Sequence, residues 1–276
     1  VGHLNSGSSI EAAPVYAAAS VAQVSPASAN PYFTRMGYET TNRVVGNDRR
    51  QGEIMALHAV KRMNLKAIAV VSDGSDYGNT LTRAFINAAG LLGGRIVFDG
   101  TIPPGVQNIR GALVTVQAMN HDALYFGGMA EQAAELAGAM RELKLAGPLL
   151  TGDGACIEDF LTAAKDAAAN MRCTIGEPGI DQLPGATAFE ARYRKRFGHP
   201  STVYAPYAYD AVQVIAQAMR DAGSVQPRAI TEALRGVKLT GITGPIAFDR
   251  HGDLVDAPFS VFRSDGKRLH VVEPLR

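Results

Sequence analysis

Short apolar runs alternate with longer helix-like stretches through the first two-thirds of this chain, and this alternation strongly constrains its fold. The runs that predict buried strands are 66–71, 95–98, 122–126 and 148–151, and the stretches that predict helices are 77–92, 109–119, 129–145 and 157–164. Short apolar runs between helices are typical of parallel sheets built from βαβ units. The sequence therefore predicts an α/β fold.

The pattern differs at the two ends of the chain. Residues 1–4 and 21–24 predict strands, and an Ala-rich helix is expected from Ile10. After Gly176, helices are expected at 186–197, 204–222 and 226–235, followed by a β-like tail at 246–272. No long flexible linker interrupts the sequence, which argues against two independent domains joined as beads on a string.

Composition excludes some classes of partner. The 276 residues include 27 basic and 26 acidic side chains without a basic stripe, so nucleic acid is not an expected partner. The apolar runs are far shorter than the roughly 20 residues of a membrane span. Because Val1 lies within a predicted strand, we expect that residues precede it, and no leader indicates a compartment.

Two polar turns, 5–9 and 25–31, follow predicted strands and supply several serine hydroxyls. In an open α/β sheet, ligands bind at the carboxyl ends of strands, and a helix N-terminus there attracts anions. Ser6 and Ser28 are therefore candidate ligands for a carboxylate. Alternatively, Ser6 and Ser8 cap the helix that follows, as serine commonly does.

Three further polar turns, 72–78, 127–128 and 152–154, follow strands in the same way. They supply Tyr77 and the carboxylate of Asp153, while glycines such as Gly154 let a ligand approach the backbone. Donors for a carboxylate and an acid for an ammonium together suit an amino acid. Alternatively, Asp153 caps the helix near Ile157, and Tyr77 packs in the core with its hydroxyl at the surface.

Catalytic and metal motifs are absent from the sequence. It has no zinc-spaced cysteines, Walker A loop or Gly-x-Ser-x-Gly elbow, and its six histidines are scattered. We therefore expect neither an enzyme nor a metal or cofactor site. The two cysteines, Cys156 and Cys173, are compatible with a disulfide or with two buried thiols.

Several segments in order resemble the leucine/isoleucine/valine-binding proteins, the periplasmic receptors of branched-chain amino-acid ABC importers. The segments are VGHLNSGSS (1–9), SPASANP (25–31), YG (77–78), YFGG (125–128), GDG (152–154), YAYD (207–210) and GPIAFD (244–249). The resemblance covers the whole chain. The ordered set is far more specific than any one of its motifs.

This resemblance implies a two-lobed fold, the type I periplasmic-binding-protein fold. Each lobe is a parallel sheet flanked by helices, three hinge segments connect the lobes, and the ligand occupies the interlobe cleft. Residues 1–48 and 177–257 correspond to lobe 1, and residues 49–176 and 258–276 to lobe 2. Family members have about two further βα units before the position of Val1. The resemblance also implies a periplasmic location.

The resemblance assigns roles to the turn residues. It implies that Ser6 and the turn formed by Ala27, Ser28 and Ala29 bind the carboxylate and part of the ammonium of the ligand. Tyr77 closes over the ligand, and Asp153 pairs with the ammonium. Many relatives also have a disulfide where Cys156 and Cys173 stand.

The chain departs from the family pattern at three positions. Ala29 replaces a threonine whose hydroxyl holds the head group, and losing a hydrogen bond to a charged group costs about 1.5–3 kcal/mol. Met129 replaces an aromatic residue and reshapes the side-chain pocket. Asp153 is shorter than the glutamate of some relatives.

The expected function is that of an extracytoplasmic binding component of an ABC importer for a small, branched-chain or other aliphatic, amino acid. Its expected partners are the ligand and the permease subunits in the membrane. Three alternatives remain open at this stage: a receptor for an aromatic or keto acid or an amide, a ligand-sensing module without a permease, and an enzyme on the same scaffold. No nucleophile–base pair supports the last of these.

Overall fold

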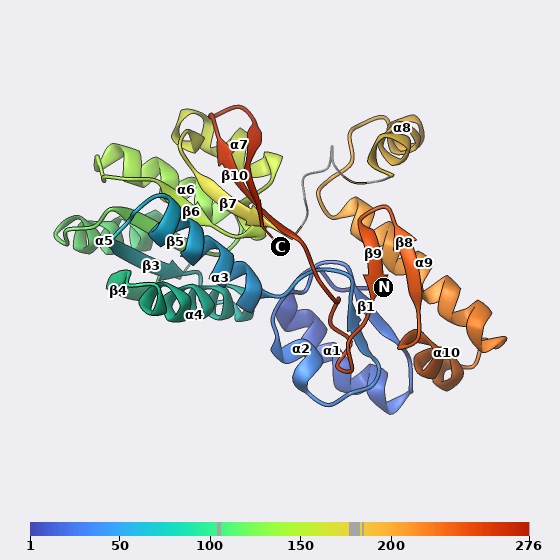
Figure 1. The fold of residues 1–276 in the computed structure, drawn as a ribbon. Coiled ribbons are helices and arrows are strands. Elements are labelled where there is room, and N and C mark those ends of the chain that lie inside the picture. Colours follow the sequence, from blue (N-terminus) through green and yellow to red (C-terminus); the bar gives the residue numbers. More distant parts are fainter. Residues whose placement is uncertain (104–105, 177–182, 184, 276) are drawn as a thin grey trace. The chain divides into compact units, whose positions relative to one another are not determined.

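A computed structural model describes residues 1–103, 106–176, 183 and 185–275 of the chain (Figure 1). The chain divides into two compact units. Unit 1 comprises Val1–Asn47 and Glu177–Pro258, and unit 2 comprises Asp48–Gly176 and Phe259–Leu275. The predicted lobe boundary at residue 177 and the last residue, 276, lie outside the described residues.

Unit 2 is built on a seven-stranded sheet with the strand order β11-β10-β7-β6-β5-β3-β4. Its strands are β3 (Ala67–Ser72), β4 (Arg95–Thr101), β5 (Ala123–Gly127), β6 (Leu149–Thr151), β7 (Arg172–Ile175), β10 (Phe259–Ser264) and β11 (Leu269–Leu275). Strands β3 to β7 pair in parallel, whereas β10 pairs antiparallel with β7 and β11. The predicted α/β class is confirmed, with strands β3 to β6 at the four predicted apolar runs.

Helices cover the sheet of unit 2. They are α3 (Asp48–Leu57), which continues as a π-helix (His58–Arg62), α4 (Asp76–Leu91), α5 (Val106–Gln117), α6 (Ala130–Glu142) and α7 (Glu158–Ala164), with short 3₁₀ turns at Asp153–Ala155 and Lys165–Ala168. Figure 1 shows α3 and α4 packed together on one side of the sheet and α5, α6 and α7 on the other. Every residue of β3 and β5 is buried, as expected for strands covered on both faces.

Unit 1 holds a short parallel pair of strands, a hairpin and several helices. Its elements are α1 (Ser6–Ala18), β1 (Gln23–Ser25), α2 (Tyr32–Arg35), β2 (Thr41–Arg43), α8 (Ala186–Phe197), α9 (Ala205–Ala222), α10 (Pro227–Leu234), β8 (Lys238–Gly241) and β9 (Gly244–Ala247). Val24, Val44, Val214 and Leu234 belong to the apolar core that joins these elements. The helices predicted after Gly176 are α8, α9 and α10.

The predictions for the first ten residues are wrong in two respects. Residues 1–4 form no strand, although the N–H of Gly2 donates to the carbonyl oxygen of Val24 in β1 at 3.1 Å and the Ser25 hydroxyl of β1 donates to the carbonyl oxygen of His3 at 3.0 Å. Helix α1 begins at Ser6 and not at Ile10, because Asn5 is the extended residue that precedes the helix. The serine-rich segment is thus the first turn of α1, where several N–H groups have no intrahelical acceptor.

Candidate functional site

In unit 1, the first turn of α1 lies against the turn that follows β1. The Oγ of Ser6 accepts a hydrogen bond of 3.2 Å from the N–H of Asn30. Neither Ser6 nor Ser8 caps α1, because the N-cap residue is Asn5, which makes no side-chain capping bond. Since the Ser6 oxygen accepts from Asn30, its hydroxyl proton remains available for an acceptor outside the turn.

Serine side chains fix the shape of the turn after β1. The Oγ of Ser25 accepts from the N–H groups of Ala27, at 3.2 Å, and Ser28, at 2.8 Å. The Oγ of Ser28 is buried and lies 2.6 Å from the Oγ of Ser9 and 3.0 Å from the carbonyl oxygen of His3. The Ser28 hydroxyl is therefore used within unit 1 and does not replace a hydroxyl at Ala29.

Two backbone groups of this turn have no hydrogen-bond partner among the described residues. Within the described part of the chain, no group pairs with the N–H of Ala29 or the carbonyl oxygen of Ala27. Together with the hydroxyl of Ser6 and the first N–H groups of α1, they form a set dominated by donors. Such a set suits a carboxylate, with one oxygen acceptor for a second polar group.

In unit 2, Tyr77 and Asp153 are in direct contact. Ser75 caps α4 by accepting from the N–H of Gly78 at 2.9 Å, which places Tyr77 in the first turn of the helix. The Tyr77 hydroxyl donates to Oδ1 of Asp153 at 2.9 Å and accepts from the N–H of Gly154 at 3.1 Å. The alternative that the Tyr77 hydroxyl lies at the surface is wrong, and α7 begins after Ile157, so Asp153 does not cap it.

Met129 and Gly154 complete this group. A Cβ atom at Gly154 would lie 2.8 Å from the carbonyl oxygen of Gly128, 3.0 Å from the Tyr77 ring and 3.1 Å from the sulfur of Met129. Only a residue without a side chain fits there without displacing its neighbours. The structure thus brings together the four residues predicted in this unit.

The expected disulfide between Cys156 and Cys173 is present, with a Cα–Cα distance of 5.5 Å. It ties the turn after β6 to strand β7. The N–H of Cys156 also donates to the carbonyl oxygen of Asp153 at 3.0 Å. The disulfide therefore restrains the backbone that carries the Asp153 carboxylate.

Sequence reasoning missed a buried polar group beneath Tyr77. The Nε2 of Gln51 donates to the carbonyl oxygen of Thr174 at 3.0 Å, and a Cβ at Gly152 would lie 3.2 Å from the Gln51 Oε1 and 2.6 Å from the Tyr77 hydroxyl. Tyr125 is also buried in this unit; burial, with the charges of Asp48 and Asp153, raises its pKa well above 10.0. Tyr125 therefore stays a neutral hydroxyl. The glycine at position 152 was the one sequence signal for this packing, because a side chain there would meet Tyr77 and Gln51.

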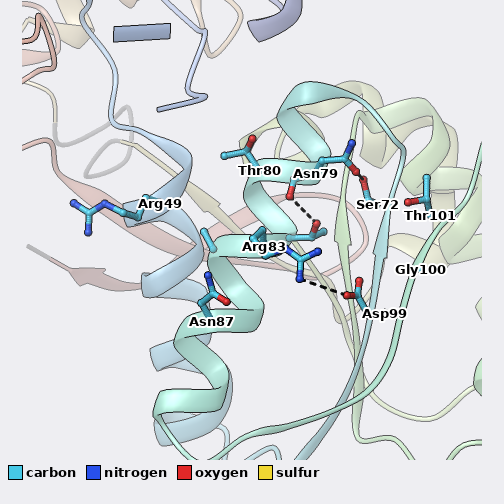
Figure 2. Close-up of a pocket in the computed structure, with 11 residues that line it drawn as sticks. Arg49, Ser72, Asn79, Thr80, Arg83, Asn87, Asp99, Gly100 and Thr101 are labelled. Atoms are coloured by element: carbon cyan, nitrogen blue, oxygen red, sulfur yellow. Dashed lines mark hydrogen bonds and ion pairs between the residues drawn. The ribbon is translucent and has the colours of Figure 1, made fainter. Parts of the chain in front are cut away.

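A groove of about 490 Å³, lined mostly by polar residues, also lies in unit 2, beside α4 (Figure 2). Figure 2 shows Thr80, Arg83 and Asn87 along the helix, with Asp99 facing Arg83 at an N–O distance of 3.8 Å. None of the four predicted ligand residues of this unit lines the groove. We therefore do not count it as part of the candidate site.

The described residues contain no group of three or more His, Cys, Asp or Glu side chains that could hold a metal ion. Among their helices, none has the length and apolar character needed to cross a bilayer.

Comparison with known proteins gives consistent matches. The family model for periplasmic binding proteins matches residues 1–268. The Leu/Ile/Val-binding protein homolog 1 of Brucella abortus is 28% identical over 254 residues, which are 92% of this chain and 68% of that protein. The leucine-specific-binding protein of Salmonella typhimurium is 27% identical, covering 95% of this chain and 71% of that protein. A leucine-binding protein of Thermotoga maritima superposes with a TM-score of 0.93 at 28% identity, over 99% of this chain and 78% of that one.

Proposed function

The chain belongs to the periplasmic binding protein family, and we propose that it binds a small aliphatic amino acid, branched-chain in the first instance, as the substrate-binding component of an ABC importer. The observation that carries this proposal is the Asp153 carboxylate, held by the Tyr77 hydroxyl at 2.9 Å on the same unit as Met129. An acidic group fixed in this way suits an ammonium. The relatives named for leucine, isoleucine and valine support the same ligand class.

The residues of unit 1 take the other end of the amino acid in this proposal. The N–H of Ala29, the Ser6 hydroxyl and the first turn of α1 donate to the carboxylate, and the carbonyl oxygen of Ala27 accepts from the ammonium. Ser28 shapes the turn, because its hydroxyl is bonded within the unit. Met129 and Gly154 border the ligand side chain, for which a flexible thioether provides an adaptable apolar wall.

A partner and a location follow from this role. We propose that the loaded protein delivers its ligand to permease subunits in the membrane, and that it works outside the cytoplasm. The Cys156–Cys173 disulfide supports that location, because disulfides persist in oxidising compartments such as the periplasm. We propose binding without chemical change, so bound ligand should be recovered intact by mass spectrometry.

The test of the ligand class is a thermal-shift screen with amino acids, aromatic acids, keto acids and amides. Because a ligand that binds only the folded state stabilises it, we expect aliphatic amino acids to raise the Tm, with leucine, isoleucine or valine among the strongest. Shifts from aromatic or keto acids alone would contradict the amino-acid assignment.

A carboxylic acid without an ammonium is a second candidate ligand, and Ala29 is the observation that favours it. The side chain at this position offers no hydroxyl to a head group, and the Ser28 hydroxyl is bonded elsewhere. Donors to a carboxylate remain in unit 1 whatever the ligand. Comparing an amino acid with its deaminated analogue separates the two candidates.

A further inference from the structure

Arg43, the last residue of β2, lies fully buried behind the turn formed by residues 25–31. Its side chain has 0% exposure. Its Nη1 donates to the carbonyl oxygen of Ser28 at 2.8 Å, and its Nη2 donates to that of Asn30 at 3.0 Å. One guanidinium therefore fixes two peptide groups of the turn that we assign to the ligand carboxylate.

A second set of contacts fixes the guanidinium itself. Its Nε donates to Oδ1 of Asp253 at 2.8 Å, and its Nη2 donates to the Oγ1 of Thr34 at 2.7 Å. Thr34 in turn donates to the same Asp253 oxygen at 2.7 Å, and the guanidinium carbon lies 5.5 Å from the centre of the Phe33 ring. Asp253 balances the charge of Arg43, so the arginine acts on the turn chiefly through directed hydrogen bonds.

The bond from Arg43 sets the direction of the peptide group between Ser28 and Ala29. The carbonyl of Ser28 and the N–H of Ala29 belong to the same trans peptide, so they point in opposite directions. Because the carbonyl points at Arg43, the N–H of Ala29 points away from it, and no described residue accepts from this N–H. A charged donor on the carbonyl also polarises the peptide and strengthens its N–H as a donor.

We propose that Arg43 is a positioning residue for carboxylate recognition, acting through the Ser28–Ala29 peptide without touching the ligand. It holds this peptide so that the N–H of Ala29 faces the carboxylate. Arg43 also holds Asn30 through its carbonyl oxygen, and the N–H of Asn30 donates to the Oγ of Ser6. This inference rests on the proposed function, since it concerns how the same site distinguishes a carboxylate from a neutral group.

The experiment compares affinities for leucine and for leucinamide, which lacks the carboxylate, by isothermal titration calorimetry. If leucine is not the acid found in the screen, the pair is that acid and its amide. In Arg43→Lys, an ammonium on a shorter reach cannot make both carbonyl bonds. We expect the acid to bind about tenfold more weakly, while the amide changes by less than about threefold.

The matched control is Arg35→Gln. Arg35 also contacts Asp253, at 3.4 Å, but its side chain is 48% exposed and it forms no bond to the turn among the described residues. The variant therefore removes a positive charge beside Asp253, while Arg43 still holds the turn. We expect both affinities to stay within about twofold of wild type, since an exposed ion pair contributes little.

A second variant, Thr34→Val, serves if Arg43→Lys does not fold, as judged by circular dichroism. It removes one contact of the guanidinium and keeps the shape of the side chain. We expect a loss of acid-over-amide preference of about threefold. Equal losses of affinity for acid and amide in the folded variants, or an unchanged preference for the acid, would overturn the inference. The proposed function would still stand if the wild-type protein bound the acid. If wild type binds no carboxylate at all, both fall.

Discussion

At the residue scale, the Tyr77 hydroxyl joins the side chain and the backbone of one short turn. It donates to the Asp153 carboxylate and accepts from the N–H of Gly154, the next residue in the chain. Because both partners belong to the Asp153–Ala155 turn, the hydroxyl holds that turn against α4. The Tyr77 hydroxyl therefore contributes to the orientation of the Asp153 carboxylate.

Replacing Tyr77 by phenylalanine tests this contribution. We expect the affinity for the amino acid to fall about tenfold, because the hydrogen bond to a charged group is lost and the Gly154 N–H loses its acceptor. Titration calorimetry measures the change. The control is Tyr209→Phe on α9, whose ring lies beside Phe189, 5.7 Å between centroids. Equal affinity in Tyr77→Phe and wild type would show that the hydroxyl does not orient Asp153.

Which side chains lie at a turn was easier to predict than what each one does there. Tyr77 and Asp153 stood out because polar residues followed apolar runs. The hydroxyl of Ser28 fits the same rule, yet it bonds to Ser9 and to the backbone of His3. Arg43 gave no such signal, because its role depends on carbonyl groups that are distant along the chain from its own strand.

At the scale of elements, α4, α6 and the turn after β6 meet at Gly154. The hypothetical Cβ at this position lies within 3.1 Å of three neighbours, the Gly128 carbonyl oxygen, the Tyr77 ring and the Met129 sulfur. The backbone oxygen cannot move aside as a flexible side chain can. The close approach of these elements therefore requires glycine.

We expect Gly154→Ala to lower the affinity for the ligand by about tenfold or more, because displacing Tyr77 or the turn weakens the hold on Asp153. Calorimetry measures the affinity, and urea unfolding measures stability. Gly138→Ala is the matched control, since its Cβ would meet nothing within 4 Å in the middle of α6. It should raise stability by about 0.5–1 kcal/mol. A Gly154→Ala protein with wild-type affinity would contradict the packing argument.

The disulfide joins the same turn to β7 and closes a loop with a sequence separation of 17 residues. Removing it in the double variant Cys156→Ala/Cys173→Ala should cost about 3 kcal/mol of unfolding free energy in the chain-entropy model. We also expect weaker ligand binding, because the turn that carries Asp153 loses its covalent link to β7. Urea unfolding and calorimetry give the two quantities. Unchanged stability would show that the turn is held without the disulfide.

Long, strongly patterned elements were predictable from sequence, and their ends were less so. Strand β3 and helix α4 follow directly from an apolar run and a capped periodic stretch. The start of α1 was missed because serine and glycine are poor helix formers, although the first turn of a helix tolerates them. Strand β1 overlaps the strand predicted at 21–24, whereas β2 is three polar residues long and carries no apolar pattern to predict it.

At the scale of the whole molecule, the Arg43–Asp253 pair ties folding stability to pH. Burial alone raises the pKa of Asp253, but the Arg43 charge and the hydrogen bonds from Thr34 and Arg43 outweigh it and hold the pKa below the ordinary 3.8. The folded protein therefore binds this proton less readily than the unfolded chain. The stabilisation that ionised Asp253 gives the folded protein is complete above about pH 4, and it is lost as the pH falls through the lower pKa of Asp253 in the folded state.

We expect Asp253→Asn to lower the unfolding free energy at neutral pH by about 3–5 kcal/mol, because it leaves the buried Arg43 without its charge partner. Below about pH 4 the deficit should narrow, since wild-type Asp253 itself becomes protonated there. Urea unfolding as a function of pH measures both effects. Asp256→Asn, at an exposed position of the same loop, should show neither. A deficit that stayed constant down to acid pH would contradict the assignment.

The fold class of the molecule could be inferred from the alternation of strands and helices, but the grouping of segments could not. The helices after Gly176 pack with residues near the start of the chain, as in the contact between the hydroxyl of Thr231 and the carbonyl oxygen of Ser20 at 2.9 Å. Local periodicity carries no information about such distant partners. Before the structure, only the family resemblance gave an expectation for this grouping.

We propose that one ligand is recognised through both its carboxylate and its ammonium. The most direct test is calorimetric titration of the wild-type protein with leucine, with leucinamide, which lacks the carboxylate, and with isocaproate, which lacks the ammonium. We predict that leucine binds most tightly and that each analogue binds at least about tenfold more weakly. Isocaproate binding as tightly as leucine would contradict the role of Asp153, and leucinamide binding as tightly would contradict that of Ser6 and Ala29.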